Sequence, residues 1–427
     1  MSEPRRAGLR AGGVNVLMHT LRPPATGDLG AEVGALLDDV RLRGDDALVD
    51  GARRFDCPEF THDRIRVPRA ALESAPDAVS PELREAILTA ADQVRAVSEA
   101  LMPAEVDVTL PPGQRVRVRA VPVDSAGCYV PGGRAAYPSS LVMCAVPAQV
   151  AGVGRVAVCS PPGPDGRVAT PVLAAAALVG VDEVYAAGGA AAIGALTYGT
   201  ATIPPVAVVT GPGNPWVQEA KRQVVGAVGI DGVAGPSEVL ILADRSADPE
   251  AMAADLLAQA EHGPDSVSVL ATAEPEVLEA VAEALAGAPE PIGQVTLVEC
   301  GSWPLAVDLA EAMAPEHLQL CLRDAEEVAA AVTRSGAVFL GPTGGTAFGD
   351  YVAGSNHVLP TGGAARYASA LGPTTYLRRM SVVEMPQAAV DALTPQLAAL
   401  ADAEGFPLHR RSAELRVSRR PARAERP

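Results

Sequence analysis

The chain has 427 residues, of which 48% are hydrophobic but only 3% aromatic, so its core must be built mainly from Ala, Val and Leu. That composition suits helices packed on buried parallel sheets, and the length allows two or three domains. The formal net charge of −17 argues against nucleic acid and anionic membranes as partners, because both select basic surfaces. With no apolar run long enough to span a membrane and no signal-peptide pattern, we expect a cytoplasmic protein. The six cysteines form no CxxC pair, so we expect reduced, buried thiols.

The first hundred residues predict a helical scaffold. Residues 1–27 are rich in Gly, Arg and Pro and show no period, so we expect an arm that is either loose or packed on a partner. Apolar positions at helical spacing predict helices over residues 29–54 and 81–101. Neither helix carries a group of residues typical of a catalytic or binding site.

A regular alternation of strand and helix then predicts two parallel sheets. It follows a strand expected over residues 116–123 and a Gly- and Pro-rich segment, 127–133, that is expected to be irregular. Strand and helix in turn are typical of βαβ units. We therefore expect an α/β fold of two doubly wound, Rossmann-like parallel-sheet domains with an N-terminal helical arm and a C-terminal helical tail. The strands are expected at 156–160, 183–187, 206–210, 239–243, 267–272, 295–299, 318–322 and 337–340.

We expect glycine-rich loops at the carboxyl ends of several of these strands. They are Gly188–Gly189, Gly211–Asn214 (GPGN) and Gly235–Glu238 (GPSE). In doubly wound sheets ligands bind at the carboxyl ends of the strands, where glycine lets the backbone approach a ligand and a helix start offers free N–H groups. Tight turns between strand and helix select the same residues, so spacing alone leaves both interpretations open. No GxGxxG fingerprint follows any of the strands.

Gln259 and His262 are the first candidate metal ligands. They lie three residues apart near the end of a helix expected over residues 249–262, so their side chains share one face and can hold one ion. A lone His near a helix C-terminus is also favourable as a charge at the negative end of the helix dipole. The pair alone does not decide between these two interpretations.

Three later motifs add acids and histidines: APEHL (314–318), GDYVAGSNHVLPT (349–361) and AEGFPLH (403–409). The first places Glu316 beside His317 at the start of a strand, where both side chains can reach one crevice. The second offers Asp350 as an oxygen ligand and His357 as a ligand or a hydrogen-bonding neighbour of the site. The third closes an apolar helix with an acid and a histidine.

Together these motifs resemble the histidinol dehydrogenase family. The resemblance rests on AGPSEVL with AEHGPDS, on GPGN followed by AKR, and on the three later motifs, which occur in the family's order over residues 116–416. It implies oxidation of L-histidinol through L-histidinal to L-histidine, with Zn²⁺ (one per subunit) and NAD as cofactors. It also implies a homodimer whose subunits share their active sites.

The resemblance assigns roles to particular residues. The catalytic pair corresponds to Glu316 and His317, with His317 as acid and base and Glu316 activating the water that hydrates the aldehyde. The metal ligands, two nitrogens and two oxygens that suit zinc, correspond to Gln259, His262, Asp350 and His409. Substrate contacts correspond to the same four residues together with Ser237, His317 and Glu404, of which Glu404 and His409 are expected from the neighbouring subunit.

The implied cofactor contacts are Tyr129, Asn214 and Ala191. Ala191 stands in a GGAA segment where the family has Gln, so we expect weaker NAD binding or compensation by another residue.

The resemblance also implies a division of the chain into five parts. They are an arm (1–27), an α/β domain with the metal and catalytic site (28–125 and 237–370), a second α/β domain on the cofactor side (126–236), a C-terminal segment that reaches the partner's site (371–416) and a disordered tail (417–427).

Two alternatives stay open. A related zinc- and NAD-dependent dehydrogenase of another small alcohol, such as sulfopropanediol, would differ among the substrate contacts, and the presence of Ser237, Glu316 and Glu404 favours histidinol. A zinc hydrolase on an α/β scaffold would use Glu316 and His317 to activate water and would bind no nucleotide.

Overall fold

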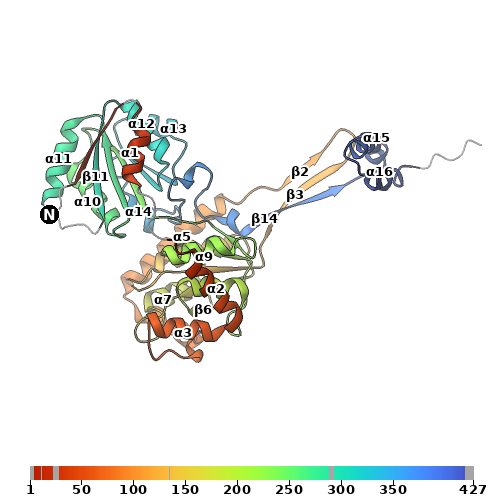
Figure 1. The fold of residues 1–427 in the computed structure, drawn as a ribbon, viewed down its shortest axis with the longest axis horizontal. Helices are drawn as coiled ribbons and strands as arrows, with labels where there is room; N and C mark the ends of the chain where they lie inside the picture. The colour runs from red at the N-terminus through yellow and green to blue at the C-terminus, as the bar shows by residue number, and fades with distance from the viewer. Residues whose placement is uncertain (1–3, 11, 23–27, 134, 288–292, 419–427) are drawn as a thin grey trace, which may run out of the picture. The chain divides into compact units, whose positions relative to one another are not determined.

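The chain divides into two compact units. The first unit comprises Met1–Leu101 and Val123–Tyr376, and the second comprises Met102–Pro122 and Leu377–Pro427. The first unit holds two parallel sheets with helices, and the second holds an antiparallel sheet with two helices (Figure 1). The predicted α/β fold class is therefore confirmed. The computed structural model describes residues 4–10, 12–22, 28–133, 135–287 and 293–418.

The six-stranded sheet of the first unit is entirely parallel, in the order β1-β11-β10-β9-β12-β13. Apart from β1, the strands follow the order 3-2-1-4-5 of a doubly wound half, in which the winding reverses between β9 and β12. The strands are β1 (Arg5–Leu9), β9 (Glu238–Ala243), β10 (Val267–Thr272), β11 (Gln294–Cys300), β12 (His317–Cys321) and β13 (Ala337–Leu340).

Helices cover both faces of this sheet, because successive residues of a strand point to opposite sides. Leu240 and Leu242 of β9 join a core with α1 and α12, whereas Val239 and Ile241 join a core with α10 and α11. Figure 1 shows these two pairs of helices on opposite sides of the strands. The helices are α1 (Val14–Leu21), α10 (Pro249–Ala260), α11 (Pro275–Ala286), α12 (Trp303–Met313), α13 (Ala325–Ala331) and α14 (Thr346–Tyr351), followed by η3 (Ala364–Arg366) and η4 (Pro373–Tyr376).

The five-stranded sheet is also parallel, and its order β6-β5-β4-β7-β8 repeats the 3-2-1-4-5 pattern. Helix α6 packs on β4 and β5, and α8 packs on β4 and β7. Its strands are β4 (Ser125–Tyr129), β5 (Arg155–Ser160), β6 (Glu183–Ala186), β7 (Val208–Thr210) and β8 (Gly229–Ile230). Its helices are α6 (Pro138–Val150), α7 (Thr170–Leu178), α8 (Gly189–Tyr198) and α9 (Pro215–Val224).

The N-terminal helices cover the helices of the five-stranded sheet: α5 contacts α6 and α7, and α2 contacts α8 and α9. This packing differs from the expected grouping of residues 28–125 with residues 237–370, because helical spacing reveals an apolar face but not the sheet that it covers. The helix expected over 29–54 is two helices, separated at Gly44 with φ +59°. The elements are α2 (Gly30–Arg43), α3 (Asp45–Phe55), η1 (His62–Arg64), α4 (Arg69–Ser74), η2 (Ala75–Ala78) and α5 (Pro81–Ala100).

Part of the expected N-terminal arm belongs to the six-stranded sheet. Strand β1 pairs in parallel with β11 at the sheet edge, and α1 packs against α12. The sequence pattern did not indicate this strand because an edge strand needs few buried side chains, and here Leu9 is the one that is fully buried. Residues 1–3, 11 and 23–27 of the expected arm lie outside the described ranges.

The segment 127–133, expected to be irregular, starts within a central strand. Gly127, Cys128 and Tyr129 are in β4, which pairs with both β5 and β7. A Cβ on Gly127 would lie 2.8 Å from a methyl carbon of Leu196, so glycine lets helix α8 approach the strand closely. The expectation was wrong for residues 127–129, because glycine in a strand interior looks like a loop signal in the sequence, and it is confirmed for residues 130–133.

The second unit is an antiparallel sheet, in the order β14-β3-β2, with two helices that contact each other. Its elements are β2 (Val106–Thr109), β3 (Arg115–Pro122), β14 (Leu377–Glu384), α15 (Gln387–Ala403) and α16 (Pro407–Glu414). The helix predicted before Glu404 is confirmed as α15. Most of the expected tail 417–427 lies outside the described residues.

Candidate active site

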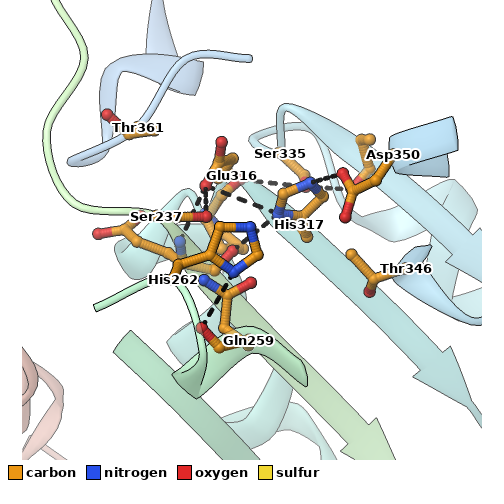
Figure 2. Close-up of polar contacts among 12 residues, drawn as sticks. Ser237, Gln259, His262, Glu316, His317, Ser335, Thr346, Asp350 and Thr361 are labelled. Carbon is orange, nitrogen blue, oxygen red and sulfur yellow. Dashed lines mark hydrogen bonds and ion pairs between the residues drawn. The ribbon is translucent and has the colours of Figure 1, made fainter. Parts of the chain in front are cut away.

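The acid and histidine of APEHL lie together at the amino end of β12, beside the amino end of the adjacent central strand β9 (Figure 2). Glu316 directly precedes β12, His317 is its first residue, and Ser237 directly precedes β9. We had expected Gly235–Glu238 at the carboxyl ends of strands, where ligands of doubly wound sheets usually bind. The structure corrects this, because that segment connects the two sheets and enters β9 at its amino end.

Glu316 is a buried carboxylate with two donors on one oxygen. Its Oε2 accepts hydrogen bonds from the Ser237 hydroxyl at 2.6 Å and from the Glu238 N–H at 2.9 Å. Burial raises the pKa of Glu316 more than the nearby His317 and these two donors lower it. None of the residues that the structure describes donates to Oε1, so that oxygen can take a proton from water.

The ring of His317 is buried, and one of its two nitrogens is hydrogen-bonded to the backbone. Nδ1 lies 3.0 Å from the Glu238 carbonyl oxygen, which only accepts, so Nδ1 carries the proton and Nε2 the lone pair. Within the described part of the chain Nε2 has no hydrogen-bond partner, and it lies 3.5 Å from Asp350 Oδ1, close enough for an ion pair only when the ring is protonated. Burial lowers the pKa of His317, but the Asp350 and Glu316 carboxylates outweigh it and raise that pKa overall.

Glu238, which the sequence had not singled out, orients both members of this pair. Its N–H holds Glu316 and its carbonyl holds His317. The buried side chain of Glu238 is itself held by two N–H groups of Arg22, at the end of α1. A glutamate opening an otherwise apolar strand was the signal available in the sequence.

Gln259 and His262, the first expected metal ligands, lie at the end of α10. Helix α10 ends at Ala260, so Gln259 is in its last turn and His262 in the turn that follows. His262 is exposed, and its Nδ1 lies 3.2 Å from the Gln259 carbonyl oxygen, which leaves Nε2 as the lone-pair nitrogen. The Gln259 side chain is buried and, among the described residues, its Nε2 has no partner. Rotation of that amide by a half turn would present its oxygen at the same place.

Asp350 lies in α14, and His357 supports it. Burial raises the pKa of Asp350, but His317 and the other two nearby imidazoles outweigh it and lower that pKa, so the carboxylate is ionised. His357 Nδ1 donates to the Asp350 carbonyl oxygen at 2.7 Å, and Nε2 accepts from the Ser140 hydroxyl at 3.2 Å. With both nitrogens engaged, His357 is a hydrogen-bonding neighbour of Asp350 and not a ligand.

A buried amide links the two helices that carry these groups. Gln319, two residues after His317 on β12, donates to Asp255 of α10 at 2.6 Å and accepts from the Thr346 hydroxyl of α14 at 3.2 Å. Asp255 lies one helical turn before Gln259, and Thr346 opens the helix that holds Asp350. The sequence did not predict this link between α10 and α14, although a Gln within the apolar strand HLQLC was a usable signal.

The expected cofactor contacts lie at the carboxyl edge of the five-stranded sheet. Tyr129 ends β4, and its hydroxyl accepts from the Gly189 N–H at 3.1 Å. Burial raises the pKa of Tyr129 to about 12. Asn214 is exposed and caps α9 by accepting from the Val217 N–H at 3.1 Å, while Ala191 is half-buried in the first turn of α8. These residues flank the point between β4 and β7 where the winding reverses.

Comparison with known proteins decides the family. The family model described as histidinol dehydrogenase matches residues 25–417. Histidinol dehydrogenase from Rhizobium meliloti is 43% identical over 412 residues, covering 93% of this chain and 94% of that protein. The chain belongs to the histidinol dehydrogenase family. The Ruegeria pomeroyi histidinol dehydrogenase is 45% identical over 403 residues, covering 92% and 93% of the two chains. The crystal structure of histidinol dehydrogenase from Elizabethkingia anophelis superposes with a TM-score of 0.91 at 30% identity, covering 97% and 98%.

As a member of the histidinol dehydrogenase family the chain is an oxidoreductase, and its donor atoms fit a zinc ion in part within the first unit. His262 offers a nitrogen, and Gln259 and Asp350 offer oxygens, all types that zinc accepts. In the described ranges no three His, Cys, Asp or Glu side chains gather into a metal site. The fourth expected ligand, His409, and the expected substrate contact Glu404 are exposed residues of the second unit.

All six cysteines are free and buried, as expected, so none is placed to act as a nucleophile. The part of the chain that the structure describes contains no helix long and apolar enough to cross a membrane.

Proposed function

We propose that this protein oxidises L-histidinol through L-histidinal to L-histidine, with NAD as the hydride acceptor and one zinc ion per subunit. The observation that carries the proposal is the hydrogen bonding of the two ring nitrogens of His317. Its Nδ1 is committed to the Glu238 carbonyl, and its buried Nε2 has no hydrogen-bond partner among the described residues. A base held in this way, with carboxylates that raise its pKa, is suited to removing a proton from an alcohol.

The two residues of the pair divide the proton transfers. When bound, NAD supplies the acceptor for one hydride in each oxidation, and zinc supplies a fixed point for the substrate's imidazole and amine. His317 Nε2 takes the hydroxyl proton as the hydride leaves the alcohol carbon, and then releases that proton to solvent. Glu316 takes a proton from the water that adds to the aldehyde and returns a proton to the former aldehyde oxygen, which completes the hydrate. His317 then takes the hydroxyl proton of the hydrate in the second oxidation.

Zinc would be held by Gln259, His262, Asp350 and His409. The Gln259 amide, whose nitrogen has no partner within the described ranges, and the lone-pair nitrogen of His262 support this set. Ser237, whose hydroxyl already orients Glu316, would also face the substrate, and Glu404 would pair with the substrate's cationic amine.

We propose a homodimer in which Glu404 and His409 reach the partner's site. The surface around them supports this, because the second unit exposes large apolar side chains at Leu400, Phe406 and Leu408, with 65%, 51% and 79% of their surface accessible. Exposed apolar patches of this kind mark interaction surfaces. Sedimentation that shows only monomers in the active enzyme would contradict the dimer.

NAD would lie at the carboxyl edge of the five-stranded sheet, in contact with Tyr129 and Asn214. Two helices, α8 and α9, begin at this edge and direct N–H groups towards it, which suits a pyrophosphate. The half-buried methyl of Ala191 offers no hydrogen bond there.

Absorbance of reduced nicotinamide tests the proposal against its alternatives. Zinc-loaded protein with NAD is expected to form NADH from L-histidinol and not from sulfopropanediol. NADH only from another small alcohol would favour the related dehydrogenase, and product release without NADH would favour a hydrolase.

A further inference from the structure

Lys221 is the only lysine in a chain that otherwise uses arginine for its cationic side chains. It lies on α9, with 2% of its surface accessible. Arg and Lys are not interchangeable at buried sites, because ammonium is a compact charge with three donors and guanidinium is a large planar fork. The use of lysine at this one buried position is consistent with a geometric requirement for an ammonium group.

The ammonium group of Lys221 and the carboxylate of Asp231 together hold both backbone groups of one residue. Lys221 Nζ donates to the Gly211 carbonyl oxygen at 3.0 Å and pairs with Asp231 Oδ1 at 2.5 Å. Asp231 Oδ2 accepts from the Gly211 N–H at 2.7 Å, and Oδ1 accepts from the Gly232 N–H at 2.8 Å. The ion pair therefore fixes the first residue after β7.

The backbone at Gly211 has a conformation that other residues rarely adopt. Its φ is +118°, and a Cβ there would lie 2.1 Å from the Tyr129 carbonyl oxygen. One turn before Lys221, the side chain of Gln218 donates to the Gly213 carbonyl at 3.4 Å and accepts from the Ala234 N–H at 2.7 Å. Helix α9 thus holds the loop that leads into it at two carbonyls.

The loop Gly211–Asn214 ends at Asn214, whose side-chain amide nitrogen has no hydrogen-bond partner among the described residues. The Oδ1 of Asn214 is engaged by the cap of α9, so its exposed Nδ2 is the donor available to a ligand. Buried ion pairs contribute little net stability, because desolvation opposes their attraction. The pair is also neutral as a whole, so its effect on this loop is geometric and does not depend on attracting phosphates.

We propose that Lys221 and Asp231 are positioning residues for the nucleotide: they hold the loop Gly211–Asn214 in the shape that presents Asn214 and the start of α9 to NAD. The inference rests on the proposed function, in which NAD binds at this edge. Neither residue needs to touch NAD, because both lie beneath the loop.

The first test removes both charges together. Lys221→Met combined with Asp231→Asn avoids leaving one buried charge unpaired, and Asn keeps an acceptor for the Gly211 N–H. The Kd of NAD, measured by calorimetry, is expected to rise about tenfold, which corresponds to about 1.4 kcal/mol. Zinc content and the Kd of L-histidinol are expected to stay unchanged. A folded double variant with the parental Kd of NAD would overturn the inference.

A matched control is Arg155→Met. Arg155 pairs with Glu183 at the amino ends of β5 and β6, the opposite edge of the same sheet. This variant loses a partly buried ion pair but is expected to keep the parental Kd of NAD. A loss of NAD affinity equal to that of the double variant would show that any broken ion pair in this sheet has the same effect, and would overturn the assignment.

A second measurement uses the unaltered protein, so it does not depend on the double variant folding. Labelling with ¹⁵N-lysine yields a single backbone amide signal, that of Lys221. NAD is expected to shift this signal, because the loop that Lys221 holds makes the contact. An unmoved signal at saturating NAD would overturn the inference alone. A parent protein that binds no NAD and forms no NADH would overturn the proposed function and this inference with it.

Discussion

Replacing His317 by Asn separates the roles of its two ring nitrogens. The Asn amide nitrogen lies near the position of Nδ1, so it can keep the hydrogen bond to the Glu238 carbonyl that is 3.0 Å long in the structure. The variant has nothing at the position of Nε2, the buried nitrogen that we propose as the base. A positioned acid or base contributes about 10²–10⁴-fold to rate, so we expect kcat to fall by at least about a hundredfold for both oxidations.

The assay follows NADH formation from L-histidinol and, separately, from L-histidinal, with zinc content measured on the same samples. The matched variant His317→Gln places its amide nearer the Nε2 position and forfeits the bond to Glu238. It is expected to lower the unfolding temperature as well as the rate, whereas His317→Asn lowers the rate with a smaller loss of stability. A His317→Asn variant that retains zinc and oxidises either substrate at the parental rate would refute the role of Nε2.

Three further substitutions test other parts of the site. Glu316→Gln is expected to slow oxidation of L-histidinal more than that of L-histidinol, because only the second oxidation needs an activated water. Equal slowing of the two oxidations in rapid-mixing experiments would contradict the role of Glu316 in activating water. Gln319→Leu breaks the link between α10 and α14 and is expected to weaken zinc binding about tenfold in competition with a chelator, a typical effect of losing support around metal ligands. Unchanged affinity would show that the helices hold the ligands without it. Ala191→Gln is expected to lower the KM of NAD, since it adds an amide donor at the start of α8; a KM that does not fall counts against a cofactor contact there.

The sequence predicted the alternation of strands and helices well, because parallel strands buried on both faces are continuous apolar runs. It predicted less well where a local signal has two structural meanings. Gly127 looks like a loop residue but lies in β4, where its missing side chain admits α8. The short strand β1 buries little surface, so its residues carry no apolar pattern.

The polar groups of the site were identified from motifs, but their supports were not. Glu316 and His317 are adjacent in the chain, whereas Arg22 reaches Glu238 from more than two hundred residues away. Such a contact leaves no local pattern, since it depends on how β1 and α1 join the six-stranded sheet. The sequence did not predict the edge at which the catalytic pair lies. The pair is at the amino ends of the strands, whereas the carboxyl-end rule of doubly wound sheets describes only the proposed NAD contacts.

We propose that His317 and Glu316 serve two successive oxidations at a single site. This proposal is tested most directly by the number of NADH molecules formed for each L-histidinol consumed by zinc-loaded protein. We expect two NADH for each L-histidinol, with L-histidine as the product and no free L-histidinal. One NADH per L-histidinol, with L-histidinal accumulating in solution, would contradict it.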